Sequence, residues 1–206
     1  ILQTLPAALA TLLDPADCGP AFIGLPQDLQ GWAYDYPAAF FEQRVHRIRR
    51  QMPDTLEIAD AAALLRSAKR PVIVAGGGVQ YSGAVAELTA FAENHNIPVV
   101  ETIAGRANML ATHPLNTGPL GVTGSDSANT IASKADVVLA VGTRLQDFTT
   151  GSWTVFAPDA RLIGLNAGRH DAAKHRSVTV VGDARLVQVE LERAVDAALV
   201  QHEVAH

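Results

Sequence analysis

Pro71-Val-Ile-Val-Ala-Gly-Gly-Gly78 joins a short apolar run to three consecutive glycines, and the rest of the chain is organised around this segment. The run is rich in β-branched residues and too short for a helix, so it predicts a strand that is buried on both faces. Glycine allows the backbone to turn sharply after the strand and to bring its N–H groups close to a ligand. Ser82 is then predicted to cap a helix that continues to about His95.

Strand, glycine turn and helix make half of a βαβ unit, and the rest of the chain repeats this plan. Ser125 and Asp183 are predicted to cap two further helices. Strands alternating with helices predict an α/β fold over residues 54–200: a doubly wound, mainly parallel sheet of five to six strands with helices on both faces. The other strands are predicted at 97–101, 136–141, 161–165 and 178–181, and the helices at 82–94, 126–134 and 184–200.

The sequence before residue 54 does not follow this plan. Residues 2–13 predict a short amphipathic helix and residues 19–25 a strand. A single helix and strand cannot form a domain, and the chain starts at Ile1 rather than Met. Residues 1–30 are therefore interpreted as the end of a preceding domain, and the whole chain as a fragment of a longer protein.

Residues 31–53 contain several aromatic side chains and little glycine or serine, which predicts an interdomain linker packed on a neighbouring surface. A basic cluster ends this linker: Arg44, His46, Arg47, Arg49 and Arg50. We favour a solvated or salt-bridging role for the cluster over anion binding, because runs of charge are usually solvated.

The domain itself is predicted to open at Asp54-Thr-Leu-Glu57, which has the pattern of a helix capping box. Its helix should continue to about residue 68. At the other end of the chain, residues 201–206 are interpreted as a tail.

Composition limits the class of protein. The 206 residues are 48% hydrophobic and 18% charged with a net charge of −5, which suits a globular α/β protein and not a nucleic-acid-binding one. Cys18 is the single cysteine, so no intrachain disulfide can form. No leader peptide or bilayer-spanning run is recognisable, and we expect a cytoplasmic protein.

Ligands of such sheets bind where the strands end, so the residues after each strand are the candidate site. Gly76 and Gly78 fit the start of a dinucleotide fingerprint, but Tyr81 stands where its third glycine belongs. Glu101 ends the second strand, where an acidic residue can hold a ribose. A phosphate loop is excluded, because Ala84-Val85 replaces its Lys-Ser/Thr pair. A plain tight turn explains the glycines equally well.

Catalytic and metal-binding motifs are missing from the sequence. There is no nucleophile elbow, no zinc-binding cysteine pair and no H-E-x-x-H motif. A metal site could be drawn from His170, Asp171 and His175, but the neighbouring positive charges favour a solvated turn. We therefore predict no catalytic residues and no metal ligands in this chain.

An ordered set of segments resembles the thiamine-diphosphate enzymes. The segment 19–30 resembles the end of their pyrimidine-binding domain. Segments 69–78, 97–100, 113–124, 135–144 and 180–184 resemble their central domain, which is Rossmann-like. Within that superfamily, Gly31-Trp-Ala-Tyr-Asp-Tyr36, Arg44-Val-His46 and Tyr81-Ser-Gly83 resemble the trihydroxycyclohexanedione hydrolase family of myo-inositol catabolism.

The resemblance implies a scaffold and cleft-wall domain of an enzyme that opens a cyclic diketone by hydrolysing a C–C bond. Thiamine diphosphate and magnesium would be bound mainly by the pyrimidine- and diphosphate-binding domains of a homo-oligomeric parent. Gly182-Asp183-Ala184 is not the family's metal-binding G-D-G motif. The chain alone should therefore have no turnover.

Relatives of this family hold FAD or ADP at the same strand-end loops. If a nucleotide binds here, the resemblance implies contacts from Gly76, Gly77, Gly78, Thr102, Val122, Thr123, Gly142, Arg144 and Asn166. Asn166 replaces an acidic residue of the FAD-binding members. We therefore favour the interpretation that these loops bind no nucleotide. Two alternatives stay open: another acetolactate-synthase-like enzyme, or a free-standing module that binds FAD, NAD or ADP.

Overall fold

The computed structural model describes the backbone of residues 1–204 and the side chains of residues 1–197. The chain divides into two compact units, Ile1–Arg49 and Arg50–His206. Each unit is considered by itself.

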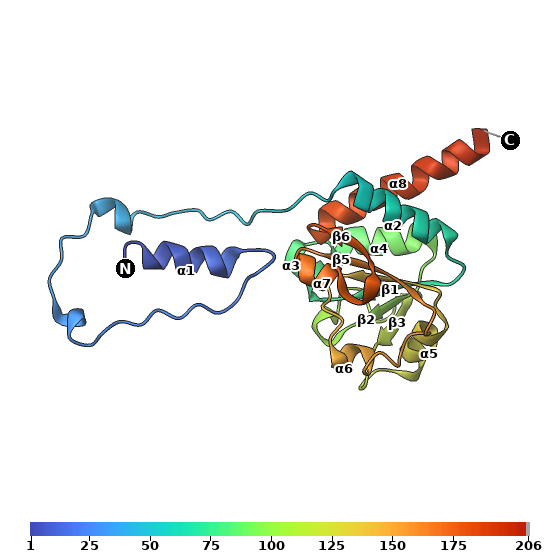
Figure 1. Cartoon of the computed structure of the whole chain (residues 1–206), viewed down its shortest axis with the longest axis horizontal. Helices are drawn as coiled ribbons and strands as arrows, with labels where there is room; N and C mark the ends of the chain where they lie inside the picture. The colour runs from blue at the N-terminus through green and yellow to red at the C-terminus, as the bar shows by residue number, and fades with distance from the viewer. Residues whose placement is uncertain (205–206) are drawn as a thin grey trace. The chain divides into compact units, whose positions relative to one another are not determined.

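The first unit contains one α-helix and two short 3₁₀ helices joined by irregular chain (Figure 1): α1 (Thr4–Leu13), η1 (Leu29–Gly31) and η2 (Ala38–Phe41). The predicted helix at 2–13 is present, whereas the strand predicted at 19–25 was wrong. A strand needs a neighbour for its backbone hydrogen bonds, and the first unit contains no other strand. Phe22 in this segment is 95% exposed.

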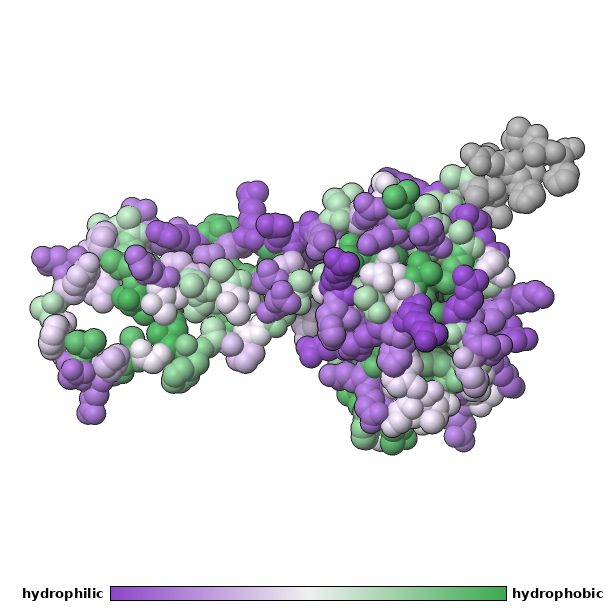
Figure 2. All heavy atoms as spheres, in the orientation of Figure 1, coloured by the Kyte–Doolittle hydropathy of each residue, from purple (hydrophilic) through white to green (hydrophobic). Residues whose placement is uncertain are grey.

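Aromatic side chains of the first unit cluster with one another instead of entering a core. Tyr36 stacks on Phe40 with ring centroids 5.5 Å apart, and Tyr34 and Phe41 meet Tyr36 edge-on. Tyr34, Tyr36 and Phe41 stay exposed, whereas Phe40 is half-buried. Other apolar residues of this unit are exposed as well, and its green areas in Figure 2 show them.

The second unit is built on a six-stranded sheet in the order β3-β2-β1-β4-β5-β6, and all neighbouring strands are parallel (Figure 1). The fold class predicted from the sequence is thus confirmed. The strands are β1 (Pro71–Ala75), β2 (Val99–Glu101), β3 (Asn116–Pro119), β4 (Val137–Val141), β5 (Arg161–Asn166) and β6 (Val178–Val181). The α-helices are α2 (Thr55–Ser67), α3 (Gly77–Ser82), α4 (Val85–His95), α5 (Asp126–Lys134), α6 (Asp147–Thr150), α7 (Arg169–Ala172) and α8 (Ala184–Val204), with 3₁₀ turns η3 (Ile103–Gly105) and η4 (Lys174–Arg176).

Strand β3 is the one strand that sequence reasoning missed. It is a half-buried edge strand with the sequence Asn-Thr-Gly-Pro, so it carries neither an apolar run nor an apolar alternation. The Thr117 hydroxyl donates to the Val99 carbonyl at 2.9 Å and helps to hold the strand on β2.

Alternation along the strands sends buried side chains into two cores, one on each face of the sheet. In β1, Ile73 and Ala75 join the core beneath α2, α4 and α8, while Val72 and Val74 join the core beneath α5. Leu145 and Phe156, from the long connection between β4 and β5, complete the second core. Helices therefore cover both faces, as the sequence predicts for a parallel sheet.

Three predicted helix caps are present, and each uses local hydrogen bonds. Asp54 accepts from the N–H groups of Leu56 and Glu57 at the start of α2. Ser125 accepts from Ala128 in α5, and Asp183 accepts from the first N–H groups of α8.

Two other local predictions were wrong. Ser82 does not open a helix: α3 starts directly at Gly77, and Ser82 ends it with its hydroxyl donating to the Gly78 carbonyl at 2.6 Å. A left-handed Gly83, with φ of 67°, then separates α3 from α4. Glu57 does not close a capping box either, because its Oε2 accepts from the Val181 N–H at 2.8 Å.

Among the described residues, no helix combines the length and the apolar character needed to cross a bilayer.

Candidate functional site

The candidate site lies at the carboxyl end of the sheet, between β1 and β4. The chain leaves β1 toward β2 on one side, and β4 lies on the other side, so this is where the strand order reverses. Ligands of doubly wound sheets bind at such a point. The turns that flank it are residues 76–78 after β1 and residues 142–144 after β4.

The two turns are packed directly against each other. The Gly78 N–H donates to the Gly142 carbonyl at 2.9 Å, and the Gly76 N–H donates to the Val141 carbonyl at 2.9 Å. A Cβ on Gly78 would lie 2.6 Å from the Gly142 Cα, and a Cβ on Gly76 would overlap the Gly142 carbonyl oxygen. The absence of side chains is therefore needed for contact between two turns of the same chain.

Gly77 and Thr102 are also occupied within the protein. A Cβ on Gly77 would stand 3.1 Å from the Ala104 carbonyl. The Thr102 hydroxyl is buried and accepts from the Gly105 N–H at 3.1 Å, which caps the short turn after β2.

Asn108 was not predicted to belong to this site. Its amide Nδ2 donates to the Gly76 carbonyl at 2.8 Å, and the residue is fully buried. Its Oδ1 is buried and has no hydrogen-bond partner among the described residues. It follows no strand directly, so no position in the sequence pattern marks it.

The position of Glu101 differs from that of an acidic residue that holds a ribose. It is 3% exposed, and its Oε1 accepts from the Met109 N–H at 3.1 Å. Its Oε2 lies 3.7 Å from Nε of Arg106, an exposed residue. The carboxylate thus ties the end of β2 to the loop that follows it.

The remaining predicted residues are partly brought to the same edge. Asn166 is half-buried, donates to the Thr143 carbonyl at 3.1 Å and accepts from the Gly168 N–H at 3.0 Å. Val122, Thr123 and Arg144 are exposed. The Val122 N–H donates to the Phe148 carbonyl at 3.0 Å, which joins the loop after β3 to α6.

Several donors at this edge are used within the chain and are not left for the diphosphate of FAD or ADP. A diphosphate cradle needs backbone N–H groups that point toward the ligand. Here the N–H groups of Gly76 and Gly78, the Thr102 hydroxyl and the Asn166 amide all have partners in the chain. Of the predicted contacts in the described part of the chain, Arg144 supplies the formal positive charge, from an exposed position.

The turn at residues 170–175 and the Gly182-Asp183 turn, which sequence reasoning set aside as metal sites, also have side chains with partners in the chain. Asp171 pairs with Lys174 at 2.6 Å, and His175 packs against Trp153. Desolvation lowers the pKa of His175, and the charge of Lys174 lowers it further. Asp183 caps α8 and pairs with Arg50 at 2.6 Å, so both oxygens of its carboxylate have partners within the chain.

The family model described as "Thiamine pyrophosphate enzyme, central domain" matches residues 58–191. A 3D-(3,5/4)-trihydroxycyclohexane-1,2-dione hydrolase of Geobacillus thermodenitrificans is 48% identical over 178 residues, covering 86% of this chain and 28% of its own length. The hydrolase of the same name from Clostridium perfringens is 44% identical over 191 residues, covering 92% of this chain and 30% of its own length.

A solved structure has the same architecture. It is an X-ray structure assigned to a thiamin diphosphate-dependent enzyme of Mycobacterium smegmatis, with a TM-score of 0.72 and 27% sequence identity. The likeness covers 95% of this chain and 38% of the other. The present chain therefore spans less than a third of the curated relatives named above and about two-fifths of the solved one.

Proposed function

Because this chain belongs to the thiamine pyrophosphate enzymes and forms their central domain, we propose that the whole protein opens the ring of 3D-(3,5/4)-trihydroxycyclohexane-1,2-dione by hydrolysis. The supporting observation is the 48% identity to a relative that bears the name of this hydrolase. The reaction would place the protein in inositol catabolism, in the cytoplasm.

In this proposal the chain is the scaffold of the enzyme and one wall of its active-site cleft. Bound thiamine diphosphate supplies a carbanion that can attack a carbonyl carbon. The cofactor and its magnesium ion would be held by pyrimidine- and diphosphate-binding domains of the same parent, assembled as a homo-oligomer. The carboxylate of Asp183 supports this division of work, because both of its oxygens have partners within the chain.

The proposal includes no nucleotide at the strand-end turns. Its support is that the Gly76 and Gly78 N–H groups donate to the Val141 and Gly142 carbonyls and are not left for a diphosphate. Calorimetric titration of the chain with FAD, NAD and ADP should give no saturable heat. Saturable binding of any of the three would contradict this part of the proposal and favour a nucleotide-binding role.

Domain replacement tests the function itself. The segment of the Geobacillus hydrolase that aligns with this chain is exchanged for the present sequence, and loss of the diketone is measured with thiamine diphosphate and Mg²⁺. The chimera should open the ring, and the isolated chain should not. Thiamine diphosphate binding and circular dichroism show that the chimera is folded and loaded.

A loaded, folded chimera without ring opening would contradict the proposed role of this chain as the central domain of such a hydrolase. Pyruvate condensation by the whole protein would instead assign it to the acetolactate-synthase-like branch. The native hydrolase, carried through the same cloning steps, is the control.

A further inference from the structure

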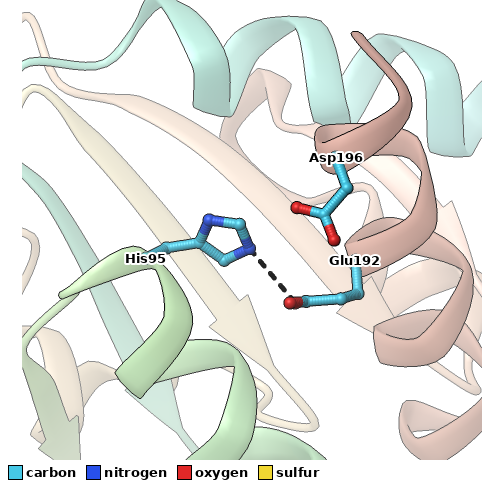
Figure 3. Close-up of side chains that lie close together, drawn as sticks. All are labelled: His95, Glu192 and Asp196. Carbon is cyan, nitrogen blue, oxygen red and sulfur yellow. Dashed lines mark hydrogen bonds and ion pairs between the residues drawn. The ribbon is translucent and has the colours of Figure 1, made fainter. Parts of the chain in front are cut away.

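Three side chains of types that can bind a metal ion lie close together between α4 and α8, away from the candidate site. His95 comes from the last turn of α4, and Glu192 and Asp196 lie one turn apart on α8 (Figure 3). Helix α4 ends just before β2, so this cluster lies at the amino end of the parallel strands. The strand-end turns discussed above are at the opposite end of the sheet.

The donor atoms are already close together. Nε2 of His95 lies 3.1 Å from Oε2 of Glu192, and the ligand atoms of all three residues lie within 4.8 Å of one another. In a tetrahedral zinc site with bonds of 2.0–2.1 Å, neighbouring donors are roughly 3.3 Å apart. A metal ion therefore needs only a small separation of His95 from Glu192 and an inward movement of Asp196.

A neighbouring side chain orients the central carboxylate. The Asn94 amide donates to Oε1 of Glu192 at 2.8 Å, which leaves Oε2 directed at His95. Outer hydrogen bonds of this kind orient the ligands of metal sites. The His95 and Glu192 side chains are 16% and 24% exposed and Asp196 is exposed, so a cation could enter from the Asp196 side.

The local charge also favours a divalent cation. Glu192 and Asp196 together contribute two negative charges, and neither forms an ion pair with a lysine or arginine among the described residues. His95 lies at the C-terminal end of α4, where the helix dipole is negative. A dication would neutralise the pair of carboxylates, and a neutral imidazole is a preferred ligand of zinc.

We propose that His95, Glu192 and Asp196 bind a divalent transition metal, best matched by Zn²⁺, with water completing a tetrahedral shell. The ion would tie α4 to α8 on one face of the sheet. The site is structural and independent of the proposed hydrolase function, because it does not approach the carboxyl end of the strands.

Binding is measured on the chelator-treated 206-residue chain, with Zn²⁺ in calorimetry and Co²⁺ in absorption spectroscopy. We expect one saturable equivalent. Each of His95→Ala, Glu192→Gln and Asp196→Asn should weaken it at least tenfold, and Asn94→Ala should weaken it by about ten- to a hundredfold. Glu190→Gln is the matched control, since Glu190 lies on the same helix but pairs with Arg193.

The other histidines of the chain can add weak background binding, which the triple variant His95→Ala/Glu192→Gln/Asp196→Asn measures directly. Equal affinity in the wild type and the triple variant would overturn the proposal. If a variant does not fold, histidine nitrogen spectra of the wild type decide the question. Zn²⁺ should shift the His95 resonances first, and a shift of other histidines with His95 unchanged would overturn the proposal.

Discussion

Gly78 and Gly142 are in backbone contact at the point where the strand order reverses. The Gly78 N–H donates to the Gly142 carbonyl at 2.9 Å, and a Cβ on Gly142 would stand 2.7 Å from the Gly78 Cα. Gly142 also has a φ of 58°, which side-chain-bearing residues adopt with strain. This contact fixes the turn after β1 to the turn after β4.

Gly142→Ala should therefore destabilise the domain by about 3 kcal/mol, from left-handed strain together with overpacking. Urea denaturation measures the change in the free energy of unfolding. Gly83→Ala is the matched control: its φ is also positive, at 67°, but no atom lies within 4 Å of an added Cβ. It should lower the free energy by only about 1–2 kcal/mol. Equal losses at both positions would show that the glycine contact has no role.

Arg50 and Asp183 form an ion pair at the start of α8. The Asp183 side chain is 6% exposed and the Arg50 side chain 37% exposed. Arg50→Ala leaves a buried carboxylate without its cation and should lower the free energy of unfolding by about 2 kcal/mol. This is less than the loss expected on breaking a fully buried ion pair, because Arg50 is partly solvated.

Asp183→Ala should destabilise the domain further, by about 3 kcal/mol, because it also removes the cap of α8. Asp183→Asn keeps the capping oxygen and separates the two effects. Thermal and urea unfolding of the three variants check the order. If Arg50→Ala lowers the free energy of unfolding no more than Arg47→Ala, at an exposed position, the ion pair has no stabilising role.

Glu57 joins two parts of the sequence that are far apart. Its Oε2 accepts from the Val181 N–H at 2.8 Å, at the last residue of β6. Glu57→Ala should lower the free energy of unfolding by about 2 kcal/mol, since a backbone donor loses a charged acceptor. Hydrogen exchange at the Val181 amide should become at least tenfold faster.

Glu57→Gln retains an acceptor oxygen. In this variant the Val181 amide should exchange at a rate between those of the wild type and Glu57→Ala. If the amide of Asp54 were affected instead of Val181, Glu57 would act as the capping box that the sequence predicts.

Asp136 makes the stability of the domain depend on acidic pH. Burial raises the pKa of Asp136, but hydrogen bonds from the N–H groups of Lys69 and Arg70, at 2.8 and 2.9 Å, together with its own N–H and the charge of Arg70, lower that pKa overall. A carboxyl with a lowered folded-state pKa adds stability above its unfolded-state pKa, and this stability is lost as the pH falls through the folded-state value.

Asp136→Asn should therefore flatten the acid side of the stability–pH curve, below about pH 4. Chemical denaturation at a series of pH values measures this. Asp60→Asn, at an exposed position, should leave the curve unchanged. An unchanged acid limb in the Asp136 variant would show that its two backbone contacts do not stabilise the folded state.

The sheet and most of its boundaries could be predicted, because the signals are local. Short β-branched runs such as Pro71–Ala75 and Val137–Val141 are buried on both faces and are recognisable without their neighbours. Asp54, Ser125 and Asp183 cap helices through residues two or three positions away. Strand β3 carries no such signal, because its polar residues are held by β2 and not by a core.

From the sequence alone we could predict the fold class, the positions of five of the six strands and the turns that follow them. Tertiary structure decided what those turns do: Gly76 and Gly78 approach Gly142, and Glu57 reaches Val181. It also brought His95 to Glu192, although 97 positions separate them. Periodicity and capping depend on residues a few positions apart, whereas contacts between distant segments depend on how helices and strands pack, which no local pattern encodes.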